Sequence, residues 1–298
     1  MQFYNVKKGS GFKMDGYYIW CGSCIKGDDG MYYLFASRWP KSTGFPKGYM
    51  TDSEIVLAKT ESLEKPFQFV KVLIGKRNGG YWDSLMAHNP FVIKFGGKYV
   101  LFYIGRENED SEYRKIGYAV SDSICGSWKR SDQPLGLLGD VNNPCAFIGE
   151  NGKMLLYYRD KGLKVSVAES EGDDCDFKTL KTDLFCGKRV EDMFVYRDGE
   201  KIMMLCEDAD GSFSGLKKGG ILFSSLDGIN FKYQEKAYDF DICNTDGKHM
   251  MLQRRERPFI LFDGGRQFLF SSAKYGGEEI LTGGDTWNMV QEIKTEER

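Results

Sequence analysis

A short hairpin pattern occurs five times in this chain and limits its fold more than any other feature. In the clearest copy, a polar run ends in Asn89-Pro90 and leads into an apolar segment at 91–93. A Gly96-Gly97 turn follows, and then a second apolar segment at 99–104. Two β-rich runs separated by a glycine turn are typical of a β-hairpin. This hairpin therefore has polar groups at its entrance.

The other four copies have nearly the same internal length. In each copy a position at the entrance is followed, 11 or 12 residues later, by a position in the second strand. These pairs are Gly22 and Leu34, Pro90 and Leu101, Pro144 and Leu156, Met193 and Met204, and Pro258 and Leu269. The second-strand positions of successive copies are 67, 55, 48 and 65 residues apart. A constant inner module with variable outer loops is typical of radial β-repeats.

The segments after each hairpin predict the rest of each repeat. Third strands are expected at 54–58, 116–120, 165–168 and 221–224, and fourth strands are expected to start near Phe67, Trp128, Phe177 and Phe231. In the fifth copy we expect the third strand near Trp287–Val290, with the lead-in at 1–19 closing the ring. The sequence thus predicts one domain over residues 1–298, an all-β, five-bladed β-propeller with four-stranded antiparallel blades. The long connection at 38–52 is expected to be a rim loop over the site.

The composition excludes several classes of protein. A net charge of −2 gives no broad basic surface for nucleic acid. No segment reaches the roughly 18 apolar residues that a membrane span needs. The N-terminal segment lacks the apolar core of a signal peptide, so the eight cysteines are interpreted as reduced thiols of a cytoplasmic protein. The oligomeric state stays open.

The entrances of the five hairpins should meet at one mouth of the central channel, because the first strand of each propeller blade lines that channel. Crowded carboxylates in such a place can have their pKa values pushed apart, which supplies an acid and a base. The residues expected there are Trp20, Asp83, His88, Asn89, Asn142, Asn143, Glu191, Asp192, Glu256 and Arg257.

The five units, with Asn-Pro or Glu-Asp entrances followed by a glycine turn and an aromatic strand, resemble the five-bladed propeller glycosidases. These include the arabinanases and β-xylosidases of family 43 and the β-fructosidases. The Ala87-His88-Asn89-Pro90 motif, with His249 seven residues before Glu256, resembles family 117 and its sucrase-labelled bacterial relatives. Family-43 enzymes use an Asp base in blade one, where this chain has Cys21-Gly22.

The family-117 resemblance implies that Asp192 and Glu256 are the catalytic carboxylates and that His249 is a candidate acid. Asp15, the carboxylate just before the first blade, is a candidate replacement for the missing base. Two of these residues also have a structural interpretation: Asp192 can bond to a neighbouring blade, and Glu256 can pair with the arginines beside it. Glu191 is expected to point away from Asp192, because side chains alternate along an extended strand.

The remaining candidates are expected to bind substrate. Trp82 beside Asp83 is a pairing suited to stacking on a sugar ring and bonding its hydroxyls. We expect Trp82, His88, Asp192, His249 and Glu256 to line one pocket. The full set of expected substrate-binding residues is Trp20, Trp82, Asp83, His88, Asn89, Asn143, Arg159, Glu191 and Arg257.

These residues predict a glycoside hydrolase, expected to invert configuration, that acts on a small arabinoside, xyloside, fructoside or anhydro-galactoside. The alternatives are a non-catalytic carbohydrate-binding propeller and a glycoside phosphorylase with phosphate held by Arg38, Arg159 and Arg257. No cofactor and no catalytic metal are expected, although the channel leaves room for a structural cation. The pairs Lys217-Lys218 and Arg254-Arg255 are interpreted as solvated charge.

Overall fold

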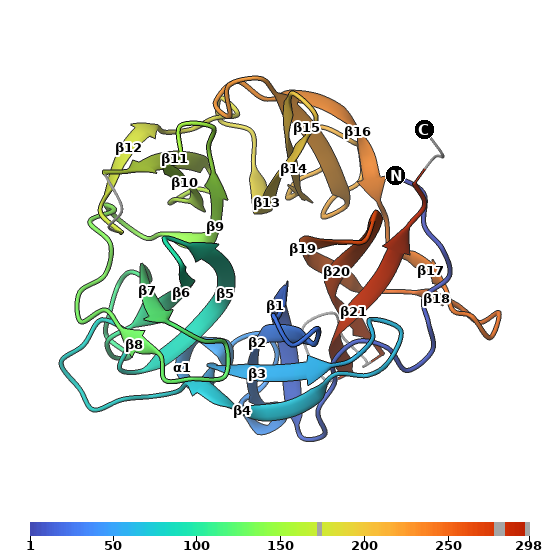
Figure 1. Cartoon of the computed structure of the whole chain (residues 1–298), viewed down its shortest axis with the longest axis horizontal. Coiled ribbons are helices and arrows are strands. Elements are labelled where there is room, and N and C mark those ends of the chain that lie inside the picture. Colours follow the sequence, from blue (N-terminus) through green and yellow to red (C-terminus); the bar gives the residue numbers. More distant parts are fainter. Residues whose placement is uncertain (172–174, 277–283, 296–298) are drawn as a thin grey trace.

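Five antiparallel sheets lie around a common axis in the computed structural model (Figure 1). The model describes residues 1–171, 175–276 and 284–295. Each sheet contains one of the five predicted hairpins, and the only helices among the described residues are η1 (Lys41–Thr43) and α1 (Tyr49–Asp52). The prediction of an all-β, five-bladed propeller is therefore confirmed.

The strands of each blade follow one another in sequence from the channel outward. Blade one consists of β1 (Tyr17–Lys26), β2 (Tyr32–Pro40), β3 (Glu54–Thr60) and β4 (Gln68–Ile74), and blade two of β5 (Met86–Phe95), β6 (Lys98–Arg106), β7 (Lys115–Ser121) and β8 (Lys129–Arg130). Blade three consists of β9 (Asn142–Ile148), β10 (Met154–Arg159), β11 (Val165–Ser170) and β12 (Phe177–Lys181), and blade four of β13 (Val190–Asp198), β14 (Lys201–Asp208), β15 (Gly220–Ser225) and β16 (Lys232–Tyr238). Blade five consists of β19 (Arg254–Asp263), β20 (Arg266–Tyr275) and β21 (Asp285–Ile293), and a separate hairpin, β17 (Asp241–Cys243) and β18 (His249–Met251), precedes it.

The predicted outer strands are also confirmed. The third strands β3, β7, β11 and β15 cover the four segments expected from the sequence. The fourth strands start at or one residue after the predicted aromatics, as at Phe177 for β12 and just after Phe231 for β16. The aromatic side chain at this position can also join neighbouring blades: Phe177 of blade three packs against Phe102 of blade two with 5.9 Å between ring centroids.

Blade five is completed by the N-terminal segment, as the sequence predicted. Phe3 pairs with Ile293 and Phe12 with Asn288 in antiparallel bridges alongside β21. The backbone N–H groups of Tyr4 and Phe12 donate to the carbonyls of Glu292 and Asn288 at 3.0 and 2.9 Å. The N-terminal segment consequently lies beside β21 of blade five (Figure 1), and this non-covalent pairing closes the ring.

The middle of the ring is filled by aromatic side chains from three first strands. Phe91 of β5, Phe194 of β13 and Phe259 of β19 have ring centroids 4.7 to 6.5 Å apart. Burial of such side chains contributes roughly 1.5–3 kcal/mol each. This aromatic cluster narrows the channel, so the polar residues above it stand at the base of a pocket.

The connection between β2 and β3 forms the predicted rim loop over the site. Its Phe45 is buried and packs against Trp20 and Trp39 at centroid distances of 5.1 and 5.8 Å. Tyr49 of α1 stacks on His88 at 4.6 Å. The loop therefore forms one wall of the channel mouth.

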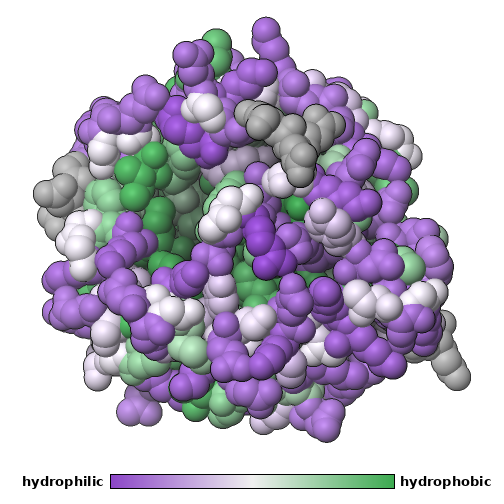
Figure 2. All heavy atoms as spheres, turned by 45° about the vertical axis from the view of Figure 1, so that its right-hand side comes forward, coloured by the Kyte–Doolittle hydropathy of each residue, from purple (hydrophilic) through white to green (hydrophobic). Residues whose placement is uncertain are grey.

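The view in Figure 2 shows a surface that is mostly hydrophilic, in which hydrophobic residues gather in a hollow. Neither helix in the described parts of the chain has the length and apolar character required to cross a membrane.

The closure of the ring gives a test of stability. Phe12 is 1% exposed within the main core, whereas Tyr4 of the same segment is 52% exposed. Phe12→Ala should lower the free energy of unfolding by about 3–5 kcal/mol, because it removes a buried aromatic ring and leaves a cavity. Tyr4→Ala should change it by less than about 0.5 kcal/mol. Urea unfolding of both variants measures this, and equal stabilities would show that the lead-in does not hold the ring closed.

Candidate active site

Each of the five first strands has a β-bulge at the channel mouth. Strand pairing shifts register at the entrance position of every hairpin. One residue in each bulge has a left-handed backbone, with φ between 48° and 60°, and these residues are Cys21, Asn89, Asn143, Asp192 and Arg257. This conformation costs a non-glycine residue roughly 1 kcal/mol or more. Its occurrence once in every blade shows that the bulge is a regular part of the repeat.

The bulge interrupts the alternation of side chains, so two consecutive residues in each blade face the channel at different depths. The upper ring, which lines the outer pocket, consists of Trp20, His88, Asn142, Glu191 and Glu256. The lower ring, which lines a smaller space beneath, consists of Cys21, Asn89, Asn143, Asp192 and Arg257. Glu191 and Asp192 thus both face the channel, and the expectation that Glu191 points away was wrong because it assumed an unbroken strand.

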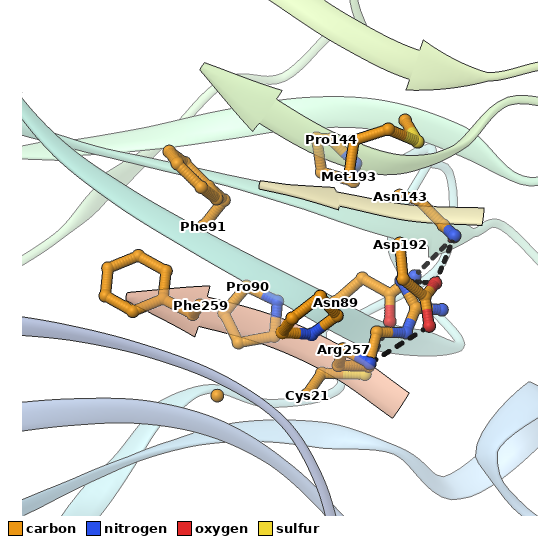
Figure 3. A pocket seen from close by; sticks show the side chains of 12 residues that line it. Cys21, Asn89, Pro90, Phe91, Asn143, Pro144, Asp192, Met193, Arg257 and Phe259 are labelled. Carbon is orange, nitrogen blue, oxygen red and sulfur yellow. Dashed lines mark hydrogen bonds and ion pairs between the residues drawn. The ribbon is translucent and has the colours of Figure 1, made fainter. Parts of the chain in front are cut away.

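Hydrogen bonds connect the residues of the lower ring from blade to blade. The Cys21 thiol donates to Asn89 Oδ1 at 2.7 Å, and Asn89 Nδ2 donates to Asn143 Oδ1 at 3.2 Å. Asn143 Nδ2 donates to Asp192 Oδ1, whose carboxylate also pairs with Arg257 Nη1 at 3.0 Å. Figure 3 shows these polar groups together at one end of the space and Phe91 and Phe259 at the other. The contacts tie the five blades together at the axis.

Cys21 occupies the blade-one position where family-43 enzymes are expected to have an Asp. Its side chain is buried, and its sulfur lies 3.5 Å from His88 Nε2. Burial raises the pKa of the Cys21 thiol to about 12, with a smaller opposing effect from Arg257. The thiol is therefore neutral and does not replace a carboxylate base.

Asp192 is the most buried carboxylate of the two rings. Burial raises the pKa of Asp192 to about 6, although Arg257 pulls it down, and the charges of Glu191 and Glu256 push it further up. The backbone N–H of Arg257 donates to its Oδ2 at 3.1 Å. The carboxyl therefore changes its charge close to neutral pH.

A second acidic group lies behind Glu256. Lys218 Nζ lies 3.0 Å from Glu207 Oε1 and 3.4 Å from Glu256 Oε1, and Arg254 Nη1 lies 3.0 Å from the same Glu256 oxygen. Glu207 is fully buried, and burial with the nearby charges of Glu256 and Asp192 raises its pKa well above the usual range. Burial alone would lower the pKa of Lys218, but the charges of Glu256 and Glu207 outweigh it and raise the pKa.

Three of these carboxylates are arranged closely enough to hold a cation. Oxygens of Asp192, Glu207 and Glu256 lie within 4.8 Å of one another. The Lys218 ammonium already contacts two of the three, so it supplies the positive charge that a metal ion would supply. We assign no metal to this group.

The outer pocket has a volume of about 170 Å³ and two different walls. One wall is formed by rings from blade one and its rim loop, namely Trp20, Trp39, Phe45 and Tyr49. The other carries charged groups from blades two to five, namely Arg114, Arg159, Glu191, Lys218, Arg254, Glu256 and Arg257. Arg159 Nη1 pairs with Glu191 Oε1 at 2.9 Å. A flat ligand can therefore stack on one side and form polar contacts on the other.

His88 joins the two walls. Its Nδ1 lies 2.8 Å from the Ser53 hydroxyl, and its ring stacks on Tyr49. Burial, together with the positive charges of Arg257 and Arg114, lowers the pKa of His88 well below its usual range. The imidazole is therefore neutral and acts as a hydrogen-bonding group at the pocket wall.

The structure brings most of the predicted site residues to the mouth but leaves Trp82 and Asp83 outside it. β5 begins only at Met86, so both belong to the preceding connection, which packs against β6 and β7. The Trp82 ring packs on Tyr103 at 4.9 Å, and its indole N–H donates to Ser131 O. Asp83 is fully buried, with Arg77 at 2.6 Å and the Tyr103 hydroxyl at 2.7 Å. These contacts are internal to blade two.

His249 and Asp15 also lie away from the pocket. His249 is on the β17–β18 hairpin with its side chain 72% exposed, 3.7 Å from Asp241. Asp15 is exposed in the turn before β1. The prediction that one pocket contains Trp82, His88, Asp192, His249 and Glu256 therefore holds only for His88 and Glu256: Trp82 and His249 lie elsewhere, and Asp192 lines the smaller space beneath. Short sequence distances to an entrance do not fix the direction of the connecting loops.

Arg38, Lys218 and the pair Arg254-Arg255 also differ from expectation, whereas Lys217 is exposed as expected. Arg38 pairs with Glu54 at 2.7 Å and covers the Tyr17 ring, outside the pocket. Lys218 and Arg254, expected to be solvated, line the pocket, and Arg255 is buried with its Nη2 donating to Gln291 at 2.7 Å. The carboxylates and glutamine facing these side chains explain why they are not solvated.

Four residues at the site were not among the site residues predicted from the sequence: Glu207, Lys218, Arg114 and Tyr49. Glu207 had a detectable signal, because it pairs with Glu191 across the hairpin that turns at Asp198-Gly199. Tyr49 reaches the site from α1, within the rim loop that was expected over the site. Arg114 and Lys218 reach it from the connections before β7 and β15, and no pattern in the sequence places them there.

The structure of this chain is similar to those of several solved glycoside hydrolases. No protein-family model and no curated protein matches the chain. A thermostable family-43 glycoside hydrolase has a similar structure, with a TM-score of 0.69 and 16% identity over 98% of this chain and 94% of that one. The β-xylosidase/α-arabinofuranosidase CoXyl43 from a compost metagenome, solved with xylotriose, has a TM-score of 0.72 and 15% identity over 99% and 95%. The RS223 β-xylosidase has a TM-score of 0.71 and 14% identity over 99% and 96%.

These likenesses extend along almost the whole chain and show that it has the five-bladed fold of family-43 glycoside hydrolases. The structural resemblance inferred from the sequence is confirmed at that level. The more specific resemblance to family 117 rested on the Ala87-His88-Asn89-Pro90 motif together with His249, and His249 lies outside the pocket.

The raised pKa of Asp192 predicts a pH dependence of stability. The carboxyl has a pKa of about 6 when folded, above its usual value of 3.8. Its protonated form is favoured in the folded state, so its contribution is complete below pH 4 and is lost as the pH rises through 6. The stability of the wild type relative to Asp192→Asn should fall by about 3 kcal/mol over this range.

Urea unfolding of the wild type and of Asp192→Asn at pH 4 to 7 measures this difference. Asp15→Asn, which changes an exposed carboxylate, provides the baseline. If the free energy of unfolding of the wild type, relative to that of Asp192→Asn, rises with pH, then ionised Asp192 is favoured by its partners, contrary to this assignment.

Proposed function

We propose that the protein is a glycoside hydrolase that acts on a small glycoside or oligosaccharide. The observation that carries the proposal is the outer pocket, where Glu191 and Glu256 come from adjacent blades and face a wall of aromatic rings. Aromatic rings stack on the apolar faces of sugars, and carboxylates bind hydroxyls and transfer protons. The shared fold with family-43 hydrolases supports the same conclusion.

The reaction requires two groups. A carboxylic acid gives its proton to the glycosidic oxygen as the bond from this oxygen to the anomeric carbon breaks. A carboxylate takes a proton from water as the water oxygen bonds to the anomeric carbon, giving a free sugar and an alcohol. In an inverting enzyme these carboxyl groups lie roughly 6.5–9.5 Å apart, and inversion remains our expectation.

We assign the base to Glu256 and the acid to Glu191. Both ion pairs of Glu256 use Oε1, so its Oε2 is not engaged by Arg254 or Lys218. Glu191 is the more accessible carboxylate, with 19% of its side chain exposed and one ion pair, to Arg159. Asp192 was predicted to be catalytic from the sequence and is therefore the competing candidate for the acid. It lies one layer lower than Glu191 and pairs with Arg257.

The substrate screen starts from the sugars suggested by the fold. CoXyl43 is described as a β-xylosidase/α-arabinofuranosidase, so aryl xylosides and arabinofuranosides come first. Fructosides and anhydro-galactosides follow. A pocket of about 170 Å³ favours a short substrate, because sites for larger organic ligands usually measure roughly 300–1,000 Å³.

Replacement of the proposed base should reduce turnover. Glu256→Gln keeps the size of the side chain and removes its ability to accept a proton, so kcat should fall by about 10²–10⁴-fold. Glu200→Gln, which changes an exposed carboxylate at the hairpin turn of blade four, should have no effect. Steady-state kinetics on the best aryl glycoside measure both. Unchanged kcat in Glu256→Gln would remove Glu256 from the mechanism.

The general acid can be identified from how the rate of each variant depends on the leaving group of the substrate. Loss of a general acid should slow substrates with poor leaving groups more than activated aryl glycosides, because only the poor leaving groups need the proton. We expect this pattern in Glu191→Gln, whereas Asp192→Asn should slow both substrates by a similar factor through displaced Arg257. The opposite result would transfer the acid role to Asp192.

The neutral thiol at Cys21 favours a second function, a carbohydrate-binding propeller without catalysis. In that case glycosides would bind at the aromatic wall but would not be cleaved. Binding without turnover in the full screen, with affinity lost in Trp20→Ala, would establish this alternative.

A further inference from the structure

The lining of the outer pocket contains more positive than negative side chains. Among the described residues, five cationic ones face it, Arg114, Arg159, Lys218, Arg254 and Arg257, against the two carboxylates Glu191 and Glu256. The carboxylates that balance the excess, Asp140, Asp192 and Glu207, are absent from the lining and stand behind it. A ligand in the pocket therefore meets a positively charged wall.

Three of the arginines have hydrogen-bonding capacity to spare. Arg159, Arg254 and Arg257 each have a buried Nε–H without an acceptor in the described parts of the chain. Each of these guanidiniums uses Nη1 in its ion pair, at 2.9 to 3.0 Å. A buried donor without an acceptor costs roughly 1–3 kcal/mol, so such groups usually serve a ligand or water.

The other two cations are already occupied. Arg114 contacts Asp140 through Nε at 2.9 Å and through Nη2, and its Nη1 donates to the Tyr49 hydroxyl. Lys218 bridges Glu207 and Glu256. Arg257 is held in the lower ring by Asp192. Arg159 and Arg254 are therefore the side chains best placed to receive a ligand.

The surroundings strengthen such a contact. The Arg254 guanidinium lies 5.4 Å from the centre of the Phe45 ring, which belongs to the aromatic wall. The rim loop limits access of water, and electrostatic attraction is stronger where water is excluded. A sugar ring stacked on this wall would bring a substituent at its edge towards Arg254.

We propose that the pocket binds an oxyanion on its substrate or co-substrate, either the carboxylate of an acidic sugar or a phosphate group, through Arg159 and Arg254. This rests on the proposed hydrolase function and specifies the class of ligand. A guanidinium binds both groups through parallel N–H···O bonds, which neutral hydroxyls do not match in strength. A neutral sugar would not provide an anionic group to pair with the excess positive charge of the lining.

The test is a comparison of ligands that differ only in the acid. Isothermal titration calorimetry at pH 7 with D-glucuronate and D-glucose isolates the carboxylate, and inorganic phosphate tests the other source. We expect glucuronate, phosphate or both to bind at least about tenfold more tightly than glucose, as expected for charge-assisted hydrogen bonds. In Arg159→Met and Arg254→Met this preference should fall to within about threefold.

The controls separate the arginines from general charge and from folding. Arg266→Met removes an exposed arginine of β20 that pairs with Glu64 and Glu292 outside the pocket, and it should keep the full preference. Arg254→Lys keeps the charge and should keep part of it, and circular dichroism shows whether each variant folds. No preference over glucose in the wild type, or a full preference in both methionine variants, would overturn the proposal.

The outcomes also separate this inference from the hydrolase itself. Preference for glucuronate indicates an acidic sugar, and preference for phosphate alone indicates a phosphorylated substrate or phosphate as the attacking group. A preserved preference without cleavage of any glycoside would disprove the hydrolase and retain the oxyanion pocket. Cleavage of neutral glycosides with no anion preference would retain the hydrolase and disprove the oxyanion pocket.

Discussion

The left-handed bulge at each channel entrance is the constraint on which the site depends. Without it, each first strand would send one residue into the channel and the next into the blade. With it, five pairs of consecutive residues form two rings, an accessible one above and a hydrogen-bonded one below. The strain of five such conformations is offset by contacts between blades, above all by the pairing of Asp192 with Arg257 and Asn143. The same geometry thus holds the axis together and presents the functional groups.

Burial governs the electrostatics of these rings. Asp192 and Glu207 have raised pKa values because burial outweighs their cationic partners, and the thiol of Cys21 and the imidazole of His88 remain neutral for the same reason. Positive charge is therefore concentrated in the arginines around the upper ring. Breaking one buried pair would leave the other charge without compensation, at a cost of roughly 3–5 kcal/mol. The pocket consequently depends on the whole network of pairs.

The sequence predicted the fold well because each propeller blade is encoded by short sequence patterns that can be recognised locally. Glycine turns, apolar strands and aromatics such as Phe177 and Phe231 each mark a structural position within a few residues. The entrance positions were also visible, which is why His88, Asn143, Asp192 and Glu256 were placed correctly at the mouth. Side-chain direction was not visible where the bulge changed it, as at Glu191. Loops were harder still: Trp82 and His249 turn away from the mouth, while Lys218 and Tyr49 turn towards it.

The absence of a carboxylate from the blade-one part of the outer pocket determines how the mouth is divided. Blade one contributes Trp20 and, through its rim loop, Phe45 and Tyr49, but no acidic group to the outer pocket. The carboxylates come instead from blades four and five, and each is paired with a cation from its own or a neighbouring blade. A substrate would therefore be held by its apolar face against blade one and by its polar edge against the opposite side. In such a site, blade one fixes the orientation of the ring, and the charged side determines which substituents and which bond are presented for reaction.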